Sequence, residues 1–363
     1  MMQVTQPTFS VRDIKMMQRC IQLARLGLGR TGANPLVGCV VAQSDKVIAE
    51  GYHQFFGGPH AEVEALAKLS SHIDLSNATL YVNLEPCCHY GKTPPCTNAI
   101  LKSGICKVVI GCSDPNPMVA GRGAAQLREA GVEVVIGVLE DLAVRLNHRF
   151  FVNQKAGRPH IILKWAQSND GFMDRLRLSG EKGQFAISCP AAANYVHQWR
   201  SDIGAVMVGR ITAENDNPQL SVRHVEGTQP ARIVWDSELR LDTTLQLFSS
   251  SGKLIILNYL KDGSQGNIRW LKVDRGINDL ANVLRSLYES GVHSILVEGG
   301  STTLQHFIDA DIWDEACVFT SPEKLGAGLL APVMKILPAK SIRVGRDILQ
   351  YFQPCTPYFP IAQ

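Results

Sequence analysis

Short apolar runs alternate with helical patterns along most of the chain, and this alternation restricts the fold more than any other feature. Apolar residues recurring every three or four positions indicate helices, whereas short apolar runs between turn residues indicate buried strands. Helical patterns begin at Ser10 and near His60, Cys96 and Ala124. The predicted strands of the first half are 36–42, 46–51, 78–84, 107–112 and 132–138. We therefore expect an α/β fold.

A polar segment with Gly and Pro, residues 147–159, interrupts this alternation. Beyond it the pattern resumes, with predicted strands at 160–166, 205–208, 232–235, 253–257 and 294–297 and a helix at 280–287. The chain has 363 residues, which is more than a single hydrophobic core usually serves. We therefore expect two α/β domains, residues 1–150 and residues 151–363.

The composition excludes several classes of protein. Hydrophobic residues make up 45% and charged residues 19%, which is typical of a globular chain rather than a disordered or fibrous one. The net charge of +3 argues against a protein built mainly to bind nucleic acid. No apolar run approaches the ~18 residues of a membrane span. Ten cysteines without an apolar leader predict a reducing, cytoplasmic location, where thiols are free or bound to metal.

The strongest local signal combines His60 and Glu62 with Cys87 and Cys96, each near the predicted end of a helix or strand. An imidazole and two thiolates are preferred zinc ligands, and three protein ligands leave one position for water. Glu62 lies close enough to His60 in sequence to move protons without binding the metal. This division of roles is that of zinc-dependent base deaminases. The alternative, ordinary helix-start residues and core cysteines, would suffice for an isolated His-x-Glu.

The remaining cysteines have no assigned chemistry. We interpret Cys88 as a spare thiol, because Pro86 precedes Cys87 directly. We expect the others to be core residues: Cys20, Cys39, Cys106, Cys112, Cys189, Cys317 and Cys355.

The second half lacks the common G-x-G-x-x-G dinucleotide fingerprint. Instead, Gly299 and Gly300 follow a predicted strand and precede a helix that begins near Ser301. Gly209 ends another strand, and Thr212 enters the next helix. Glycines at such turns let a phosphate approach the N–H groups of a helix N-terminus, although a Gly-Gly pair is often only a tight turn. Two such sites at neighbouring strand ends would suit a dinucleotide.

The spacing of the two cysteines makes the sequence recognisable. Deaminases usually carry Pro-Cys-x-x-Cys, but here eight residues separate Cys87 from Cys96, in the segment EPCCHYGKTPPC. The chain resembles the RibD family, the bifunctional deaminase/reductases of riboflavin biosynthesis. It departs from the family at Cys88, where Ser is frequent. The supporting segments are NPLVGCVV (34–41), GYH (51–53), GGPHAEVEAL (57–66), DPNP (114–117), VAGRG (119–123), KWAQSNDG (164–171), DNPQLSVR (216–223) and VEGGSTTL (297–304).

The resemblance implies a cytidine-deaminase-like zinc domain followed by a dihydrofolate-reductase-like domain that uses NADPH. In the first domain it makes His60, Cys87 and Cys96 the zinc ligands and Glu62 the proton shuttle. The implied deaminase substrate contacts are Asn34, His53, His89, Lys92, Asp114 and Asn116. The implied reductase substrate contacts are Gly183, Arg200, Leu220, Arg223 and Glu298. The implied cofactor contacts are Ala166, Phe185, Thr212, Asp216, Ser237, Gly300, Ser301, Thr302, Thr303, Leu304, Gln305 and His306.

Elementary chemistry supports part of this assignment. Lys92 in a Gly-Lys-Thr loop suits a substrate phosphate, and Arg200 with Arg223 could form a second phosphate clamp. Structural roles remain open for several of these residues. The Asn34-Pro35 pair and the segment 114–117 are also strong turn signals, Asp216 could be a turn residue, and a lone Arg is usually a solvated charge.

The implied reaction is hydrolytic deamination of 2,5-diamino-6-(5-phosphoribosylamino)pyrimidin-4-one, followed by NADPH-dependent reduction of the ribosyl side chain to ribityl. We expect a homo-oligomer that acts on a small molecule and binds neither nucleic acid nor membrane. One alternative is a nucleic-acid or nucleoside zinc deaminase with an appended non-catalytic domain, and another is a structural-zinc protein. The former predicts the short cysteine spacing, and the latter needs a fourth protein ligand. The sequence identifies no acid or base for the reduction.

Overall fold

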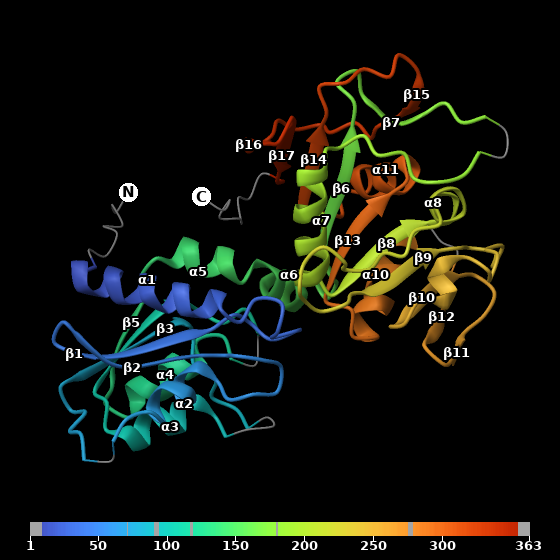
Figure 1. Ribbon diagram of the computed structural model, residues 1–363. Coiled ribbons are helices and arrows are strands. Elements are labelled where there is room, and N and C mark those ends of the chain that lie inside the picture. Colours follow the sequence, from blue (N-terminus) through green and yellow to red (C-terminus); the bar gives the residue numbers. More distant parts are fainter. Residues whose placement is uncertain are drawn as a thin grey trace, which may run out of the picture. The chain divides into compact units, whose positions relative to one another are not determined.

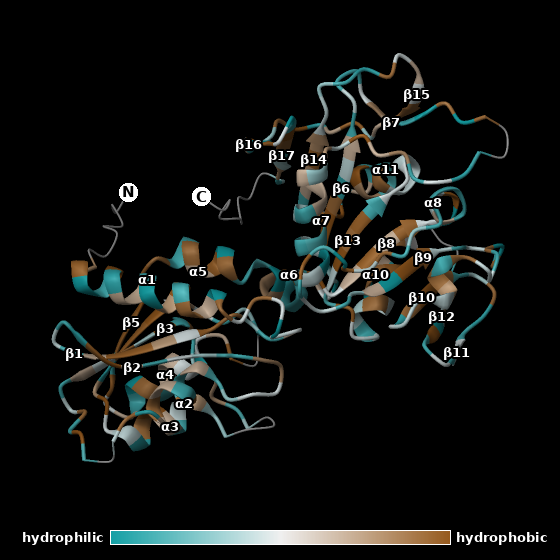
Figure 2. Cartoon of the chain, in the orientation of Figure 1, coloured by the Kyte–Doolittle hydropathy of each residue, from teal (hydrophilic) through white to brown (hydrophobic). Residues whose placement is uncertain are grey.

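The computed structural model describes residues 9–70, 72–90, 94–116, 119–178, 181–274 and 279–354 (Figure 1). The chain forms two compact units that divide between Lys155 and Ala156. Figure 2 shows hydrophobic residues concentrated along the strands of both units. No helix among the described residues is long and apolar enough to cross a membrane.

The first unit contains a five-stranded sheet in the order β2-β1-β3-β4-β5. Strand β1 pairs antiparallel with β2 and β3, whereas β3, β4 and β5 are parallel. Every residue of β3 is buried, as expected for a continuous apolar strand covered on both faces. The strands are β1 (Gly38–Gln43), β2 (Lys46–Tyr52), β3 (Ala78–Leu84), β4 (Lys107–Cys112) and β5 (Glu133–Ile136).

Helices cover both faces of this sheet (Figure 1). One face packs against α1 (Val11–Arg25) and α5 (Glu140–Leu146), through an apolar cluster that includes Met17 and Tyr81. The other carries α2 (Ala61–Leu66), α3 (Cys96–Ser103) and α4 (Arg122–Glu129), around a cluster that includes Ile100. The predicted elements of this half are confirmed in type, with boundaries shifted by a few residues. Ser10 caps α1 by accepting a hydrogen bond from the Asp13 N–H, as its position predicts.

The segment 147–159, which we predict to interrupt the alternation, is helical for most of its length. Helix α6 spans His148–Ala156, and it crosses the predicted boundary between residues 150 and 151. Phe151 packs with Leu84 and Cys112 in an apolar cluster, so tertiary burial stabilises a helix that its polar composition does not suggest. The break in the alternation is therefore a helix, and the two units divide within this segment, between Lys155 and Ala156.

The second unit is built on a ten-stranded sheet in the order β11-β12-β10-β9-β8-β13-β6-β14-β17-β16. Its central strands are parallel: β6 (His160–Gln167), β8 (Ala205–Gly209), β9 (Ala231–Trp235), β10 (Leu254–Asn258), β12 (Ile268–Lys272), β13 (Ser294–Gly299) and β14 (Glu315–Thr320). Antiparallel strands complete both edges: β11 (Gly263–Gln265), β16 (Lys340–Val344) and β17 (Asp347–Phe352). A separate two-stranded antiparallel sheet pairs β7 (Phe172–Arg175) with β15 (Gly328–Leu330).

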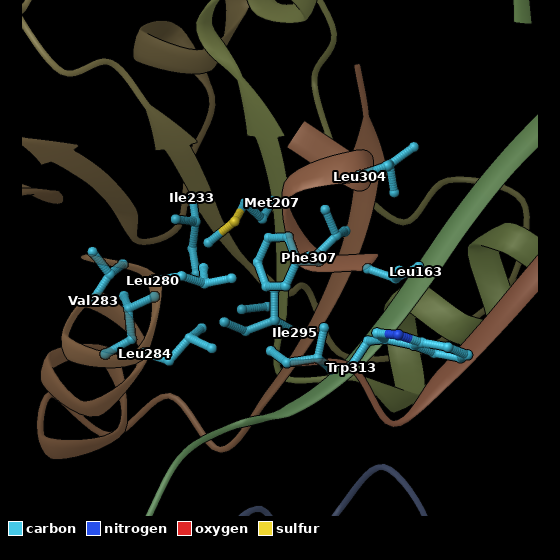
Figure 3. Packing of buried hydrophobic residues seen from close by; sticks show 14 of the residues in the cluster. Leu163, Met207, Ile233, Leu280, Val283, Leu284, Ile295, Leu304, Phe307 and Trp313 are labelled. Carbon is cyan, nitrogen blue, oxygen red and sulfur yellow. The ribbon is translucent and has the colours of Figure 1, made fainter. Parts of the chain in front are cut away.

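Two apolar clusters lie on opposite faces of this sheet. Figure 3 shows the first, in which Leu284 of α10 (Asp279–Glu289) and Phe307 of α11 (Ser301–Asp309) lie near Ile295 of the sheet. The second includes Val196 of α7 (Pro190–Asp202), Ala213 of α8 (Arg210–Asp216) and residues of the short helix α9 (Gln246–Ser249). Coverage of both faces explains why the central strands are continuous apolar runs.

The described cysteines form no disulfide bond. Cys20, Cys39, Cys112, Cys189 and Cys317 are buried, as predicted. Cys106 is exposed, so its prediction as a core residue is wrong; it lies in the turn before β4 rather than within the strand. Cys355 lies outside the described residues.

The close approach of α1 to β1 requires glycine at position 38. A Cβ added to Gly38 would lie 2.1 Å from the Cys20 carbonyl oxygen, which is backbone and cannot move aside easily. We predict that Gly38→Ala lowers the free energy of unfolding by about 1–3 kcal/mol, as overpacking typically does. Thermal unfolding measures the effect. The matched control is Gly204→Ala, where the nearest atom to the new Cβ is 3.7 Å away. An unchanged melting temperature for Gly38→Ala would contradict this packing.

Candidate active sites

Three potential metal ligands converge in the first unit. His60 is the residue before α2, Cys96 is the first residue of α3, and Cys87 lies in the segment after β3. One ligand atom from each lies within 4.8 Å of the others. His60 Nδ1 is 3.2 Å from Cys96 Sγ and 3.5 Å from Cys87 Sγ. Elements distant in sequence therefore bring together the ligands predicted from their motifs.

The chemistry of this group fits zinc. A hydrogen bond with Cys96, supported by His60, lowers the pKa of Cys87, which favours the ligating thiolate at this position. The Cys96 N–H also donates to Cys87 Sγ over 3.3 Å. One imidazole and two thiols form a three-ligand set typical of catalytic zinc. Cys88 is not among the clustered groups of the described residues, consistent with its interpretation as a spare thiol.

Glu62 lies beside this cluster, in the first turn of α2. Its side chain is buried, and this burial raises the pKa of its carboxyl group above the usual value. It lines a cavity of about 170 Å³ together with His60 and Cys87. The arrangement places a proton-accepting group next to the metal ligands.

The cavity collects most of the predicted deaminase contacts. Asn34, His53, His89, Asp114 and Asn116 all line it. Lys92 lies outside the described residues. The side chains of this set offer hydrogen-bond donors and acceptors, which suits recognition of a base edge and sugar hydroxyls.

A hydrogen-bond chain fixes His53 in one tautomer. His53 Nδ1 donates to the Pro59 carbonyl oxygen at 2.8 Å, and Asn34 Nδ2 donates to His53 Nε2 at 3.0 Å. Burial lowers the pKa of His53, so the neutral ring is favoured. The bond to His53 therefore orients the Asn34 side chain. Asn34 can serve as a turn residue before Pro35 and also line the cavity.

Two buried asparagines that sequence reasoning did not select hold the loop before β1. Asn83 Nδ2 and Asn147 Nδ2 each donate to the Leu36 carbonyl oxygen at 2.9 Å. Asn147 Oδ1 accepts from the Leu36 N–H, and Asn83 Oδ1 accepts from the Gly38 N–H, each at 2.7 Å. These bonds fix the backbone that presents Asn34. Nothing in the local pattern distinguishes these asparagines from turn residues.

Glu85 holds the loop after β4, which carries Asp114 and Asn116, by hydrogen bonds to its backbone. Its carboxylate accepts hydrogen bonds from the N–H groups of Asp114, Gly121 and Ala124 at 3.0–3.2 Å. Asp114 in turn accepts from the Asn116 N–H at 2.8 Å, and burial raises its own pKa to about 6. The Glu85 carboxylate therefore fixes the backbone of the segment that contains Asp114 and Asn116.

A larger cavity of about 690 Å³ lies in the second unit. Predicted contacts that line it are Ala166, Phe185, Arg200, Thr212, Asp216, Leu220, Arg223, Glu298, Gly300, Ser301, Thr302 and Thr303. Strands β8 and β13 are neighbours, as the dinucleotide hypothesis requires. The Gly300 N–H donates to Thr212 Oγ1 at 2.9 Å, which joins the two strand-to-helix turns.

Several predicted contacts do not line this cavity. Of the predicted contacts on α11, only Ser301, Thr302 and Thr303 line this cavity. Leu304 is buried in the core, and the Gln305 side chain donates to Asp309. The His306 ring lies against Trp235. Gly183 and Ser237 are also absent from the lining. The Gly183 N–H donates instead to the Asn215 carbonyl oxygen, and the Gly183 carbonyl oxygen accepts from Arg177 Nη1.

Arg200 and Glu298 form a buried ion pair that lines the second cavity. Arg200 Nε and Nη2 contact both carboxylate oxygens of Glu298, at 2.5 and 2.7 Å. Burial would raise the pKa of Glu298, but Arg200 lowers it overall. Lys164 also lines the cavity, and burial lowers the pKa of its amine. Strand alternation could have identified Lys164, because it lies two residues from Ala166 on β6 and therefore on the same face.

Comparisons with known proteins identify both halves. Residues 10–112 match the cytidine and deoxycytidylate deaminase zinc-binding region, and residues 159–343 match the RibD C-terminal domain. The riboflavin biosynthesis protein RibD of Actinobacillus pleuropneumoniae is 41% identical over 327 residues, which cover 87% of this chain and 85% of that protein. The chain belongs to the RibD family.

Solved RibD structures agree over nearly the whole chain. A deaminase/reductase of Thermotoga maritima has a TM-score of 0.83 at 35% identity, covering 95% of this chain and 99% of its own. The RibD of Acinetobacter baumannii has a TM-score of 0.85 at 34% identity, with the same coverage. The expected RibD order, a deaminase-type zinc domain followed by a reductase-type domain, is confirmed. The RibD match of the second half argues against an appended non-catalytic domain.

We predict that Cys96→Ser loses most of its bound zinc, because serine replaces a thiolate ligand with a weakly acidic hydroxyl. Zinc per chain, measured by elemental analysis of purified protein, reports the change. Cys88→Ser is the matched control and should keep about one zinc per chain. Full zinc retention in Cys96→Ser, or strong loss in Cys88→Ser, would show that the ligand set is different.

Proposed function

We propose that the first cavity deaminates 2,5-diamino-6-(5-phosphoribosylamino)pyrimidin-4-one, and that the second reduces the product, 5-amino-6-(5-phosphoribosylamino)uracil. The Thermotoga maritima relative carries both activities in its name. The observation that carries the proposal is the convergence of His60, Cys87 and Cys96 beside buried Glu62 in one cavity. The protein is thus a bifunctional enzyme of riboflavin biosynthesis, with Zn²⁺ and NADPH as cofactors.

In the deaminase site, the chain supplies orientation and proton transfer. His60, Cys87 and Cys96 would hold zinc, which when bound would supply Lewis-acid activation of water near neutral pH. Glu62 accepts a proton from water and delivers it to the departing amine. Asn34 and His53 form a fixed pair at the cavity wall, which can orient the pyrimidine edge. Asp114 and Asn116, anchored through Glu85, offer acceptors and donors to the sugar.

The reductase site separates cofactor binding from substrate chemistry. The turns at Gly209 and Gly300 open two helices beside neighbouring strand ends, which suits the phosphates of a dinucleotide. NADPH supplies the hydride. Reduction opens the ribose ring, so hydride joins C1′ and the ring oxygen takes a proton. Lys164 is our candidate for the source of that proton, since its buried amine loses a proton more readily than usual.

The composition supports a proposal about the class of substrate and the location of the enzyme. A net charge of +3 supports small-molecule substrates rather than nucleic acid. We propose a cytoplasmic enzyme that acts without a membrane. The homo-oligomer remains a prediction.

Glu62→Gln should separate the two activities. The amide keeps the side-chain length but cannot accept the proton, and acid–base groups typically contribute ~10²–10⁴-fold, so we predict a loss at the upper end of that range. Ammonia release from the diaminopyrimidine measures this loss. Zinc content should be unchanged, and NADPH oxidation with the supplied deaminated intermediate should continue at the parental rate. Near-parental ammonia release would remove Glu62 from the mechanism, and loss of both activities would contradict the division of chemistry.

Phe150 of α6 lines the deaminase cavity, although it stands at the predicted domain boundary and was not selected as a site residue. We predict that Phe150→Ala raises KM for the diaminopyrimidine about tenfold, since an aromatic wall typically contributes ~1 kcal/mol or more. Initial rates of ammonia release measure KM. Phe55→Ala is the control, because Phe55 is exposed and does not line the cavity. Equal KM values for parental enzyme and Phe150→Ala would exclude this role.

We also predict that the reductase prefers NADPH over NADH, as its family does. Steady-state oxidation of each cofactor with the deaminated intermediate gives the ratio of kcat/KM values. Equal efficiencies would contradict the preference and leave the reductase assignment intact.

A further inference from the structure

Arg177 follows β7 and lines the second cavity, although neither the sequence motifs nor the proposed reaction assigns it a role. Its side chain is 16% exposed, so the guanidinium is largely removed from water. Arg177 Nε donates to Asp174 Oδ2 at 2.6 Å, and Nη1 donates to the Gly183 carbonyl oxygen at 2.9 Å. Because the guanidinium is planar and rigid, these two bonds fix the direction in which its third nitrogen donates.

The third nitrogen holds Asp216. Arg177 Nη2 donates to Asp216 Oδ1 at 2.7 Å. Asp216 is the last residue of α8, and it also lines the cavity. Its other oxygen, Oδ2, accepts no hydrogen bond from any residue that the structure describes. Arg177 therefore holds one carboxylate oxygen, and the other is available to a ligand.

The surroundings of Asp216 oppose its negative charge. Burial raises the pKa of its carboxyl group above the usual value, Arg177 opposes this rise, and the neighbouring Asp174 adds to it. The free carbonyl groups at the C-terminal end of α8 also disfavour a negative charge. Among the charged groups that act on Asp216, Arg177 is therefore the group that favours the ionised form.

The same contacts fix the wall of the cavity around Asp216. The Gly183 N–H donates to the Asn215 carbonyl oxygen at 2.6 Å, next to Asp216 at the end of α8. Residues 184–188, which follow Gly183, all line the cavity. The carboxylate is therefore held between two fixed segments, and its orientation depends on the Arg177 guanidinium.

An ionised carboxylate on a cavity wall is a strong acceptor for a hydroxyl group, because charge-assisted hydrogen bonds are the strong ones. Both ligands of the proposed reduction carry such groups. NADPH has ribose hydroxyls, and the deaminated intermediate has the hydroxyls of its ribosyl side chain. The chemistry that Asp216 recognises is therefore a sugar hydroxyl.

We propose that Arg177 is a positioning residue of the reductase, which orients the Asp216 carboxylate so that Oδ2 accepts a sugar hydroxyl of a bound ligand. This inference rests on the proposed function, because that function supplies the two ligands. Arg177 acts through Asp216 and contacts no reacting atom.

Four variants, each assayed as the full chain, test this role. Arg177→Met removes the charge and the donors, whereas Arg177→Lys keeps the charge. Asp216→Asn and the double variant Arg177→Met/Asp216→Asn show whether the arginine acts through the carboxylate. Arg269→Met is the matched control, because Arg269 pairs with Asp262 and does not line the cavity. Initial rates of NADPH oxidation give KM for NADPH and KM for 5-amino-6-(5-phosphoribosylamino)uracil separately.

Arg177→Met should raise one of the two KM values about tenfold, as expected when a hydrogen bond to a charged group is lost. Its kcat should stay within about twofold. A rise in KM for NADPH identifies the cofactor ribose as the source of the hydroxyl, and a rise in KM for the intermediate identifies the ribosyl side chain. Asp216→Asn should raise the same KM, and the double variant should exceed Asp216→Asn by no more than about twofold.

The pH dependence supplies a readout that a purely structural role would not change. Without the guanidinium, the pKa of Asp216 rises further, and a protonated carboxyl group is a poorer acceptor. The increase in KM of Arg177→Met should therefore grow as pH falls and shrink as pH rises. Arg177→Lys should recover most of the affinity and the parental pH profile, and Arg269→Met should match the parental enzyme.

Unchanged KM values in Arg177→Met, an equal rise in both KM values, or a pH-independent loss would overturn the proposal. Additive effects in the double variant would also overturn it, because Arg177 would then act independently of Asp216. A parental enzyme that does not oxidise NADPH with the intermediate would instead overturn the proposed function, and the inference with it.

Discussion

The close approach of two helix N-termini to the end of β3 determines the chemistry of the first unit. Helix α2 packs on β2 where Gly51 leaves room, since a Cβ there would lie 2.5 Å from the Ala61 carbonyl oxygen. His60 and Cys96 sit at the two helix starts, and Cys87 lies just after β3. Helix N-termini favour the thiolate form of a ligand. The position of His60 beside the two cysteines therefore depends on the close packing of the α2 backbone against β2.

Buried polar groups then fix the loops around that site. Glu85 binds three backbone N–H groups, and Asn83 with Asn147 binds the Leu36 backbone. An unsatisfied buried carboxylate or amide costs free energy, so these bonds select one loop geometry over others. The second unit uses the same device in the Arg200–Glu298 pair and in the Gln229 side chain that binds Val222. In both units, buried polar side chains thereby hold the segments that line the cavities.

The sequence predicts what local pattern controls. Continuous apolar runs predicted five of the seven central parallel strands of the second unit, whereas β12 and β14 were not predicted. The motifs around His60, Cys87 and Cys96 selected three residues that the fold brings together, because each lies at an element end. Strands β16 and β17 are only partly buried along their length and lack such runs, so they were not foreseen. Helix α6 was missed because Phe151 gains its burial from residues distant in sequence. The pairing of Arg200 with Glu298 likewise depends on tertiary contact that no local pattern encodes.

We propose that the two cavities carry out consecutive reactions, deamination first and reduction second. The most direct measurement gives the parental enzyme the diaminopyrimidine with and without NADPH, and follows ammonia and NADPH together. We expect one equivalent of ammonia in both cases, and one equivalent of NADPH oxidised only after ammonia has appeared. Ammonia release that requires NADPH, or NADPH oxidation that precedes ammonia release, would contradict this order of reactions.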